Sequence, residues 1–345
     1  MNRTLLLAAL LLAAPALHAQ WSDAPDDDEA AWMEQQATTT QAYHARIATA
    51  LAASRDVRDQ AFAEILRQPA SPAGGAMPSG DTPSRAAPRD TEAEARLRSI
   101  AARAGDDRLA NQLLLLASPA PGSAERTAAA RRWHAAEPGN LVPLLHTGMA
   151  ADALLVEARR ATQATTHLYD VVRWMASAFE RHPLTPPERT ALAGGETFHP
   201  EEAAAMSAMG IWAASMAPAY GALVEACRGN ALRAAPTRQA DCRHVATLLA
   251  QQSDSVRDRM VGLSMLRGMA SDSAERAAID AQHRTMDWQM LQWGRIAQQQ
   301  PRDGAEQFVR LLRTGVTSEL ELAGRVLQEA GVSPEPPAGW TPPRR

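Results

Sequence analysis

The sequence predicts an all-α protein made of antiparallel helical hairpins, stacked as a repeat-like solenoid or a compact multi-helix domain. Alanine supplies about a fifth of the 345 residues, and leucine, arginine and glutamate are also abundant; all four are strong helix formers. Aromatic residues make up only 4%, and isoleucine and valine are scarce, although such residues favour strands. These observations exclude a β-sandwich or barrel and disfavour a doubly wound α/β sheet.

The first 19 residues have the layout of a secretory signal peptide. Arg3 provides a positive start, residues 4–16 are apolar, and the small residue Ala19 precedes a plausible cleavage point at Gln20. The apolar run is shorter than a membrane span requires, and no later segment reaches the ~20 apolar residues of a transmembrane helix. We therefore expect a periplasmic or secreted protein with no membrane contact after cleavage, with an uncleaved anchor helix as the alternative.

Two regions follow the signal peptide. Residues 20–67 predict an N-terminal helical hairpin, because acidic residues 26–29 suit a first helical turn and Ser54 suits the N-cap of a second helix. Residues 68–90 are rich in proline, glycine and serine, a composition that favours a disordered linker.

Residues 91–331 form the predicted helical body. It begins with Thr91 and Glu94, which fit a capping box, and prolines and glycines then separate the predicted helices. These are expected near 92–104, 107–117, 124–136, 141–159, 162–181, 186–193, 200–216, 218–227, 239–252, 255–270, 273–300, 303–313 and 317–330. Residues 332–345 contain several prolines and are predicted to be a disordered tail.

The two cysteines, Cys227 and Cys242, flank a loop-like stretch between two predicted helices. In an oxidising compartment such a pair is expected to form a structural disulfide. A metal site that recruits His244, or a pair of free thiols, are the alternatives. The C-x-x-C spacing of redox proteins is absent.

A family resemblance lies in residues 133–140, which read Trp-His-Ala-Ala-Glu-Pro-Gly-Asn and are followed by Leu144, Leu145 and Gly148. This pattern resembles the junction between tetratricopeptide repeats, over about residues 107–183. The resemblance implies stacked helical hairpins that present a groove to a protein or peptide. It implies no catalytic residues.

Few residues suggest chemistry, because the H-E-x-x-H, G-x-S-x-G and G-x-G-x-x-G motifs are all absent. Asp280, His283 and Asp287 share one predicted helix face and are candidates for metal binding or acid–base work. His199 beside acidic residues 201 and 202 is a second candidate. A histidine in an apolar seam and a solvated helix start explain the same residues structurally.

Methionines recur on three predicted helices, at 206, 209 and 216, at 260, 265 and 269, and at 286 and 290. Thioethers can bind Cu(I), but methionine at helical spacing usually fills a core. The net charge of −4, with both signs interspersed, gives no reason to expect nucleic-acid binding.

The sequence therefore predicts a periplasmic, non-enzymatic helical scaffold that binds a protein or peptide partner and needs no cofactor. The alternatives are an all-α envelope enzyme and a periplasmic copper protein.

Overall fold

The structure is a computed structural model, which describes residues 27–68, 91–118, 122–193, 199–215, 218, 220–233, 235, 237–299 and 301–343. The predicted signal peptide and, apart from its first residue, the predicted linker lie outside the described residues.

The all-α prediction is confirmed, because the described residues form sixteen α-helices and one 3-10 helix and contain no β-strand. The helices are α2 (Asp27–Ala52), α3 (Val57–Leu66), α4 (Thr91–Ala104), α5 (Arg108–Ala117), α6 (Ala124–Ala136), α7 (Val142–Leu145), α8 (Ala151–Ala158), α9 (Leu168–Arg181), α10 (Pro186–Ala193), α11 (Pro200–Ser215), α12 (Gly221–Ala226), η2 (Ala231–Arg233), α13 (Arg238–Gln252), α14 (Val256–Gly268), α15 (Ser273–Gln299), α16 (Pro301–Arg313) and α17 (Glu319–Glu329). Within the described ranges, no helix combines the length and apolar character needed to cross a membrane.

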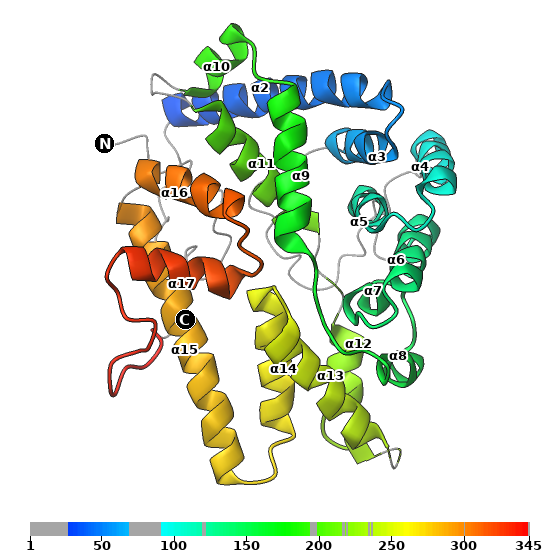
Figure 1. Ribbon diagram of the computed structural model, residues 1–345, viewed down its shortest axis with the longest axis vertical. Coiled ribbons are helices and arrows are strands. Elements are labelled where there is room, and N and C mark those ends of the chain that lie inside the picture. Colours follow the sequence, from blue (N-terminus) through cyan, green and yellow to red (C-terminus); the bar gives the residue numbers. More distant parts are fainter. Residues whose placement is uncertain are drawn as a thin grey trace.

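The helices surround α9, which stands in the middle of the molecule (Figure 1). The groups α3–α8 and α16–α17 lie on opposite sides of α9, and α12–α14 lie beyond its N-terminal end. Consecutive helices pack in pairs, with α2 on α3, α5 on α6 and α13 on α14, and α9 packs on α11, the second helix after it. One continuous core of buried apolar side chains connects these pairs.

Two predicted helices are shorter than expected. The range 141–159 is divided into α7 and α8, because Gly148 between them has a φ of +70°, which is outside the helical region. The range 162–181 is helical only from Leu168. The backbone of Thr165 and Thr166 hydrogen-bonds instead to side chains from other parts of the chain, and His167 has a positive φ of 52°.

We call residues 162–168 the central strap. Buried Asn140 donates to Thr165 O at 2.8 Å and accepts from Thr165 N at 3.1 Å. Buried Gln112 donates to Thr166 O at 2.9 Å, and Asp254 accepts from Thr166 N at 2.7 Å. Because a buried peptide group needs a partner, these side chains replace the helical bonds that residues 162–167 lack.

The N-terminal hairpin is part of the common core. The ring of Phe62 on α3 packs edge-on against Phe179 of α9, with centroids 5.4 Å apart. Tyr43 on α2 donates to His182 O at 3.2 Å, and Arg46 pairs with Glu188 at 2.8 Å. The described part of the hairpin predicted over 20–67, which comprises α2 and α3, is therefore packed on α9 and α10.

Helices α13 and α14 cross in close contact at Gly262. A Cβ atom at this position would lie 2.4 Å from Ala250 N and 2.6 Å from Ala246 O. Glycine is required here because no side chain fits between the two backbones.

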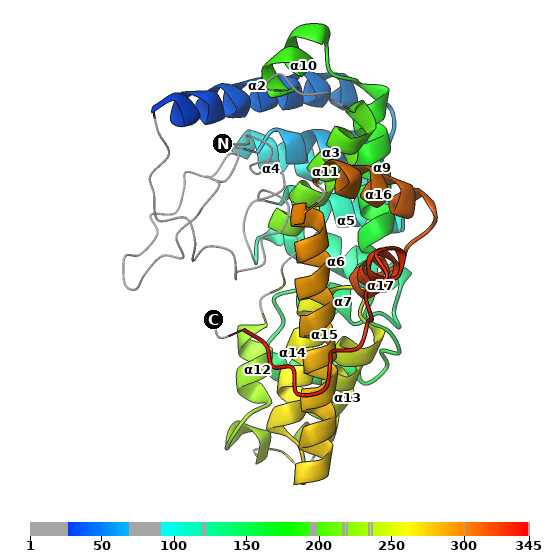
Figure 2. The ribbon, with the colours of Figure 1, turned by 90° about the vertical axis from the view of Figure 1, so that its left-hand side faces the viewer.

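The C-terminal segment was expected to be a disordered tail, but its described residues 332–343 lie along α15 (Figure 2). Trp288 on α15 donates its indole N–H to Ser333 O at 2.9 Å, and its ring packs against Trp340 with centroids 5.3 Å apart. The prolines prevent a helix, as expected, but the tryptophan pair holds the extended chain in place.

Candidate functional site

The three residues of the predicted cluster on α15 form two separate pairs. His283 Nδ1 lies 3.0 Å from Asp287 Oδ2, whereas Asp280 pairs with Arg267 of α14 at 2.6 Å. Hydrogen bonding to Arg267 lowers the pKa of Asp280. The structure therefore brings His283 and Asp287 together as one histidine–carboxylate pair. Asp280, the third residue of the predicted cluster, instead forms an ion pair that links α15 to α14.

The second predicted candidate, His199, is exposed where α11 begins. Its neighbour Glu201 pairs with Arg313 of α16 at 2.6 Å, and burial raises the pKa of Glu202. Among the described residues, no three histidine, cysteine, aspartate or glutamate side chains are placed to hold a metal ion.

The predicted disulfide is present between Cys227 and Cys242, whose Cα atoms are 5.6 Å apart. It joins the end of α12 to α13 around the loop that contains η2. Several of the methionines considered as thioether ligands, Met265, Met269 and Met286, are buried in the apolar core.

A polar cluster that the motif search missed surrounds His167, which immediately precedes α9. Its backbone φ of 52° makes it the one non-glycine residue with positive φ in the described chain, and such strain is often found at functional sites. Its Nε2 lies 2.9 Å from Glu137 Oε2. Burial would raise the pKa of Glu137, but hydrogen bonds from His167, Asn140 and Trp133 lower it to about 2.

The polar groups around His167 largely satisfy one another. Arg108 lies 3.5 Å from Glu137 and 3.2 Å from Asp170, and Asp170 also pairs with Arg173 at 2.6 Å. We therefore assign this cluster the structural task of fixing the central strap between α5, α6 and α9.

A second missed cluster contains three carboxylates, Asp254, Asp258 and Glu319, where α9, α14 and α17 begin. Asp254 caps α9 by accepting from Leu168 N at 3.1 Å, and Glu319 accepts from Val256 N at 2.6 Å. Burial raises the pKa of Asp258 to about 6 and that of Glu319 to about 7.

Two tyrosines lie near this acidic cluster. Tyr220 donates its hydroxyl to Asp258. The hydroxyl of Tyr169 is buried with no hydrogen-bond partner among the described residues, and burial followed by the charge of Glu319 raises its pKa well above the usual value. Asp254 and Asp258 are both buried, so the cluster is a junction between helices. Because the pKa values of Asp258 and Glu319 are raised, the stability of this junction must depend on pH.

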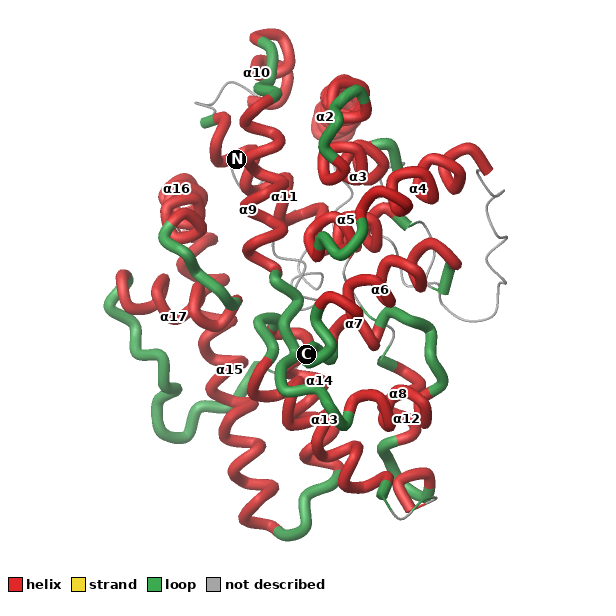
Figure 3. Tube along the Cα trace, turned by 45° about the vertical axis from the view of Figure 1, so that its right-hand side comes forward, coloured by secondary structure: helices red, strands yellow, loops and turns green. Residues whose placement is uncertain are grey.

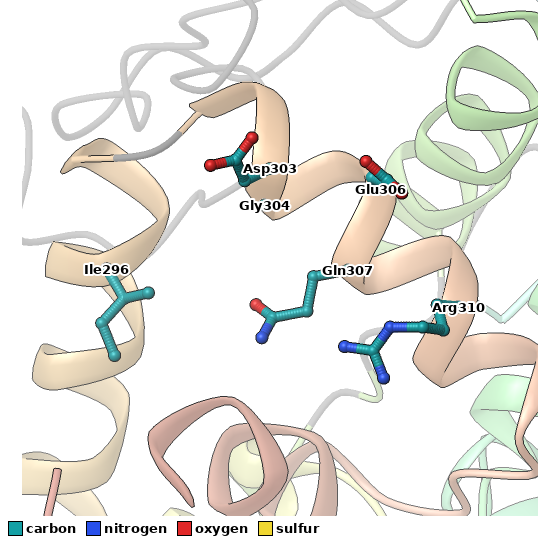
Figure 4. Close-up of a pocket in the computed structure, with 6 residues that line it drawn as sticks. All are labelled: Ile296, Asp303, Gly304, Glu306, Gln307 and Arg310. Carbon is teal, nitrogen blue, oxygen red and sulfur yellow. The ribbon is translucent and has the colours of Figure 1, made fainter. Parts of the chain in front are cut away.

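A cavity of about 260 Å³ lies between α15 and α16, lined by Ile296, Asp303, Gly304, Glu306, Gln307 and Arg310. Figure 4 shows Ile296 facing the polar side chains of α16 across this opening. Glu329 of α17 already accepts hydrogen bonds from Gln307 and Arg310, each at 2.5 Å. The charge of this arginine is therefore neutralised within the helix junction.

An apolar groove of about 330 Å³ lies between α4 and α6, and we call it the α4–α6 groove. Figure 3 shows α4 and α6 beside α5. Leu114 of α5 and Ser118, which directly follows this helix, line the groove floor. Leu97 and Leu114 are both 2% exposed, and the other lining residues are Arg98, Ala101, Ala102, Ala124, Glu125, Ala128 and Arg132.

The groove faces away from the centre of the molecule. Leu114 follows Gln112 by two residues, which is about 200° around α5, and Gln112 donates to Thr166 O in the central strap. Alanines form the walls, so that another backbone can approach closely. The groove thus combines an apolar floor, small walls and charged ends.

Comparison with known proteins provides no relative to guide the assignment, because no family model matches the chain and neither a curated protein nor a solved structure is similar to it.

Proposed function

We propose that the protein is an exported, non-enzymatic helical scaffold that binds a segment of a partner polypeptide in the α4–α6 groove. The observation that carries the proposal is the groove itself, with its floor of Leu97 and Leu114 and its alanine walls. Helical scaffolds commonly accept a peptide in an apolar groove between two helices. Among the described residues, Val156 is the one large hydrophobic side chain that is mostly exposed.

We also propose that α5 and α6 correspond to the tetratricopeptide-like part of the chain. They pack together as consecutive helices, Trp133 is fully buried, and its indole donates to Glu137 in the following turn at 2.9 Å. Residues 162–167 of the central strap are not helical, whereas such a repeat would continue as a helix there, and this marks the end of the similarity.

Export is proposed from the pattern of the first 19 residues and is consistent with the disulfide between Cys227 and Cys242. Mass spectrometry of the protein isolated from its producing cells should give a mature start near Gln20. An intact Met1 start would contradict export by cleavage.

Binding in the groove can be tested by selecting displayed random peptides on the full-length protein. Ala128→Trp places an indole in the groove and should abolish binding of the selected peptides. Ala135→Trp introduces the same side chain at an exposed position of α6 outside the groove and should leave binding unchanged. Failure to select any peptide, or equal binding by the two variants, would refute the proposed function.

A further inference from the structure

We infer that the segment bound in the α4–α6 groove carries a carboxylate, which pairs with the guanidinium of Arg132. This inference rests on the proposed function and specifies the chemistry of the ligand. Its basis is the difference between the two arginines that line the groove.

Arg132 is held in place but has no opposite charge beside it. Its Nε donates to Asn111 Oδ1 at 2.7 Å. Asn111 is fully buried, and its amide nitrogen donates to Gly105 O at 3.0 Å and Asp107 O at 2.9 Å. These bonds orient the asparagine oxygen, which fixes one edge of the guanidinium.

The remaining edge of Arg132 is available to a ligand. Within the described part of the chain, no carboxylate is within 4.0 Å of this guanidinium and its terminal nitrogens make no hydrogen bond. Burial lowers its pKa, which means that the charged form lacks full solvation. A carboxylate would supply both an opposite charge and two hydrogen-bond acceptors, because the guanidinium fork matches two carboxylate oxygens.

Arg98, the other groove arginine, is already paired. It lies 3.1 Å from Glu125 and 3.9 Å from Glu94. The positive charge at the Arg98 end of the groove is therefore balanced by carboxylates, whereas the Arg132 end remains positively charged. This asymmetry favours a ligand with one acidic group at the Arg132 end.

The spacing of the groove also restricts the ligand. Ala128 and Arg132 are one helical turn apart on α6, which is about 6 Å along the axis. A ligand in an extended conformation covers this distance in about two residues. We therefore expect an apolar side chain over Leu97 and Leu114 and the carboxylate about two residues away, from an acidic side chain or from the C-terminus of the ligand.

The test compares matched peptides selected in the groove, using fluorescence anisotropy with the full-length protein. Changing the acidic side chain to its amide, or amidating the C-terminus, identifies which carboxylate is used. The effective change should weaken binding about tenfold or more, as expected for loss of a charge-assisted hydrogen bond. Because this change is made in the peptide, misfolding of a protein variant cannot produce the result.

Two protein variants complete the test. Arg132→Gln should weaken the acidic peptide about tenfold and should bind the acid and amide forms equally. Arg131→Gln, at an exposed neighbour outside the groove, should behave as the unmodified protein.

The possible failures are distinguishable. If peptides are excluded by Ala128→Trp but bind equally as acid and amide, the carboxylate inference is wrong and the proposed function stands. If Ala128→Trp does not exclude them, the proposed function itself is wrong. A dimer that Ala128→Trp dissociates in analytical ultracentrifugation would instead assign the groove to a second copy of the chain.

Discussion

Replacing Glu319 by glutamine should stabilise the protein at alkaline pH. The carboxylate accepts a hydrogen bond from Val256 N at 2.6 Å, and the negative charges of Asp254 and Asp258 add to the effect of burial in raising its pKa. Glutamine retains an oxygen that can accept the same hydrogen bond, but it removes the charge. The substitution therefore separates the cost of ionisation from the loss of a contact.

The magnitude follows from the pKa of Glu319, which rises from 4.5 to about 7 on folding. Between these values the folded state binds more protons than the unfolded state, so the free energy of unfolding falls as the pH rises. Each pKa unit corresponds to about 1.4 kcal/mol, so the free energy of unfolding is lower by about 3 kcal/mol above pH 7. The pKa of Asp258 is also raised, to about 6, so its ionisation lowers the free energy of unfolding as well, over a lower pH range.

The assay is urea unfolding followed by far-ultraviolet circular dichroism at pH 5 and pH 8. The natural protein should be less stable at pH 8 than at pH 5. Glu319→Gln should be within about 1 kcal/mol of the natural protein at pH 5 and more stable by about 2–3 kcal/mol at pH 8. Equal destabilisation at both pH values would refute the reasoning, because it would show that only a contact was lost.

Glu321, on the same helix, provides a control, because its effect on stability should change with pH in the opposite direction to that of Glu319. A hydrogen bond from Thr317 N lowers its pKa. The ionised form is therefore the one that stabilises the folded state at pH 8, and this contribution is lost as the pH falls through the folded pKa. Glu321→Gln should destabilise the protein at pH 8.

Three further predictions concern contacts that join segments of the chain. Replacing Cys227 and Cys242 by alanine should lower the free energy of unfolding by about 3 kcal/mol in the same urea assay, the chain-entropy value for a loop of 15 residues; no change would contradict the assignment of this disulfide as a stabilising staple. Gly262→Ala should cost about 1–3 kcal/mol because its Cβ would overlap the backbone of α13, whereas Gly268→Ala, with open space around it, should be neutral or stabilising. Trp340→Ala should increase hydrogen exchange in residues 332–343 while leaving the helical circular dichroism intact, and unchanged exchange would show that the tryptophan pair does not hold this segment.

Much of the helical architecture could be predicted because local signals coincide with the packing. The apolar stripe of residues 168–179 and the prolines at 186 and 200 mark helices that the structure contains. The disulfide could be predicted because the two cysteines were the complete set and both flanked a turn. These features depend on residues close together in sequence.

The central strap and the acidic cluster depend instead on residues far apart in sequence. Asp254 precedes α14, yet its side chain accepts a hydrogen bond from the backbone of Thr166, a contact that residues 162–167 by themselves do not reveal. The polar run Thr162–His167, which has few apolar residues, was the available signal. Glu319 resembled an ordinary acidic first turn, and its raised pKa follows only from contact with α14.

The groove was missed for a related reason. Alanine at 101 and 128 is a good helix former, and one sequence cannot distinguish a wall alanine from any other. The groove appears only when α4 and α6 lie against α5. Arg132 likewise resembled a solvated arginine until its bond to Asn111 placed it at the groove end.

Hydrogen exchange measured with and without a selected peptide tests groove binding most directly. We predict that the peptide slows exchange in α4 and α6, over residues 91–104 and 124–136, and that Ala128→Trp removes this protection. Protection confined to α15 and α16, or absent from both groove helices when the peptide is bound, would contradict the α4–α6 groove as the binding site.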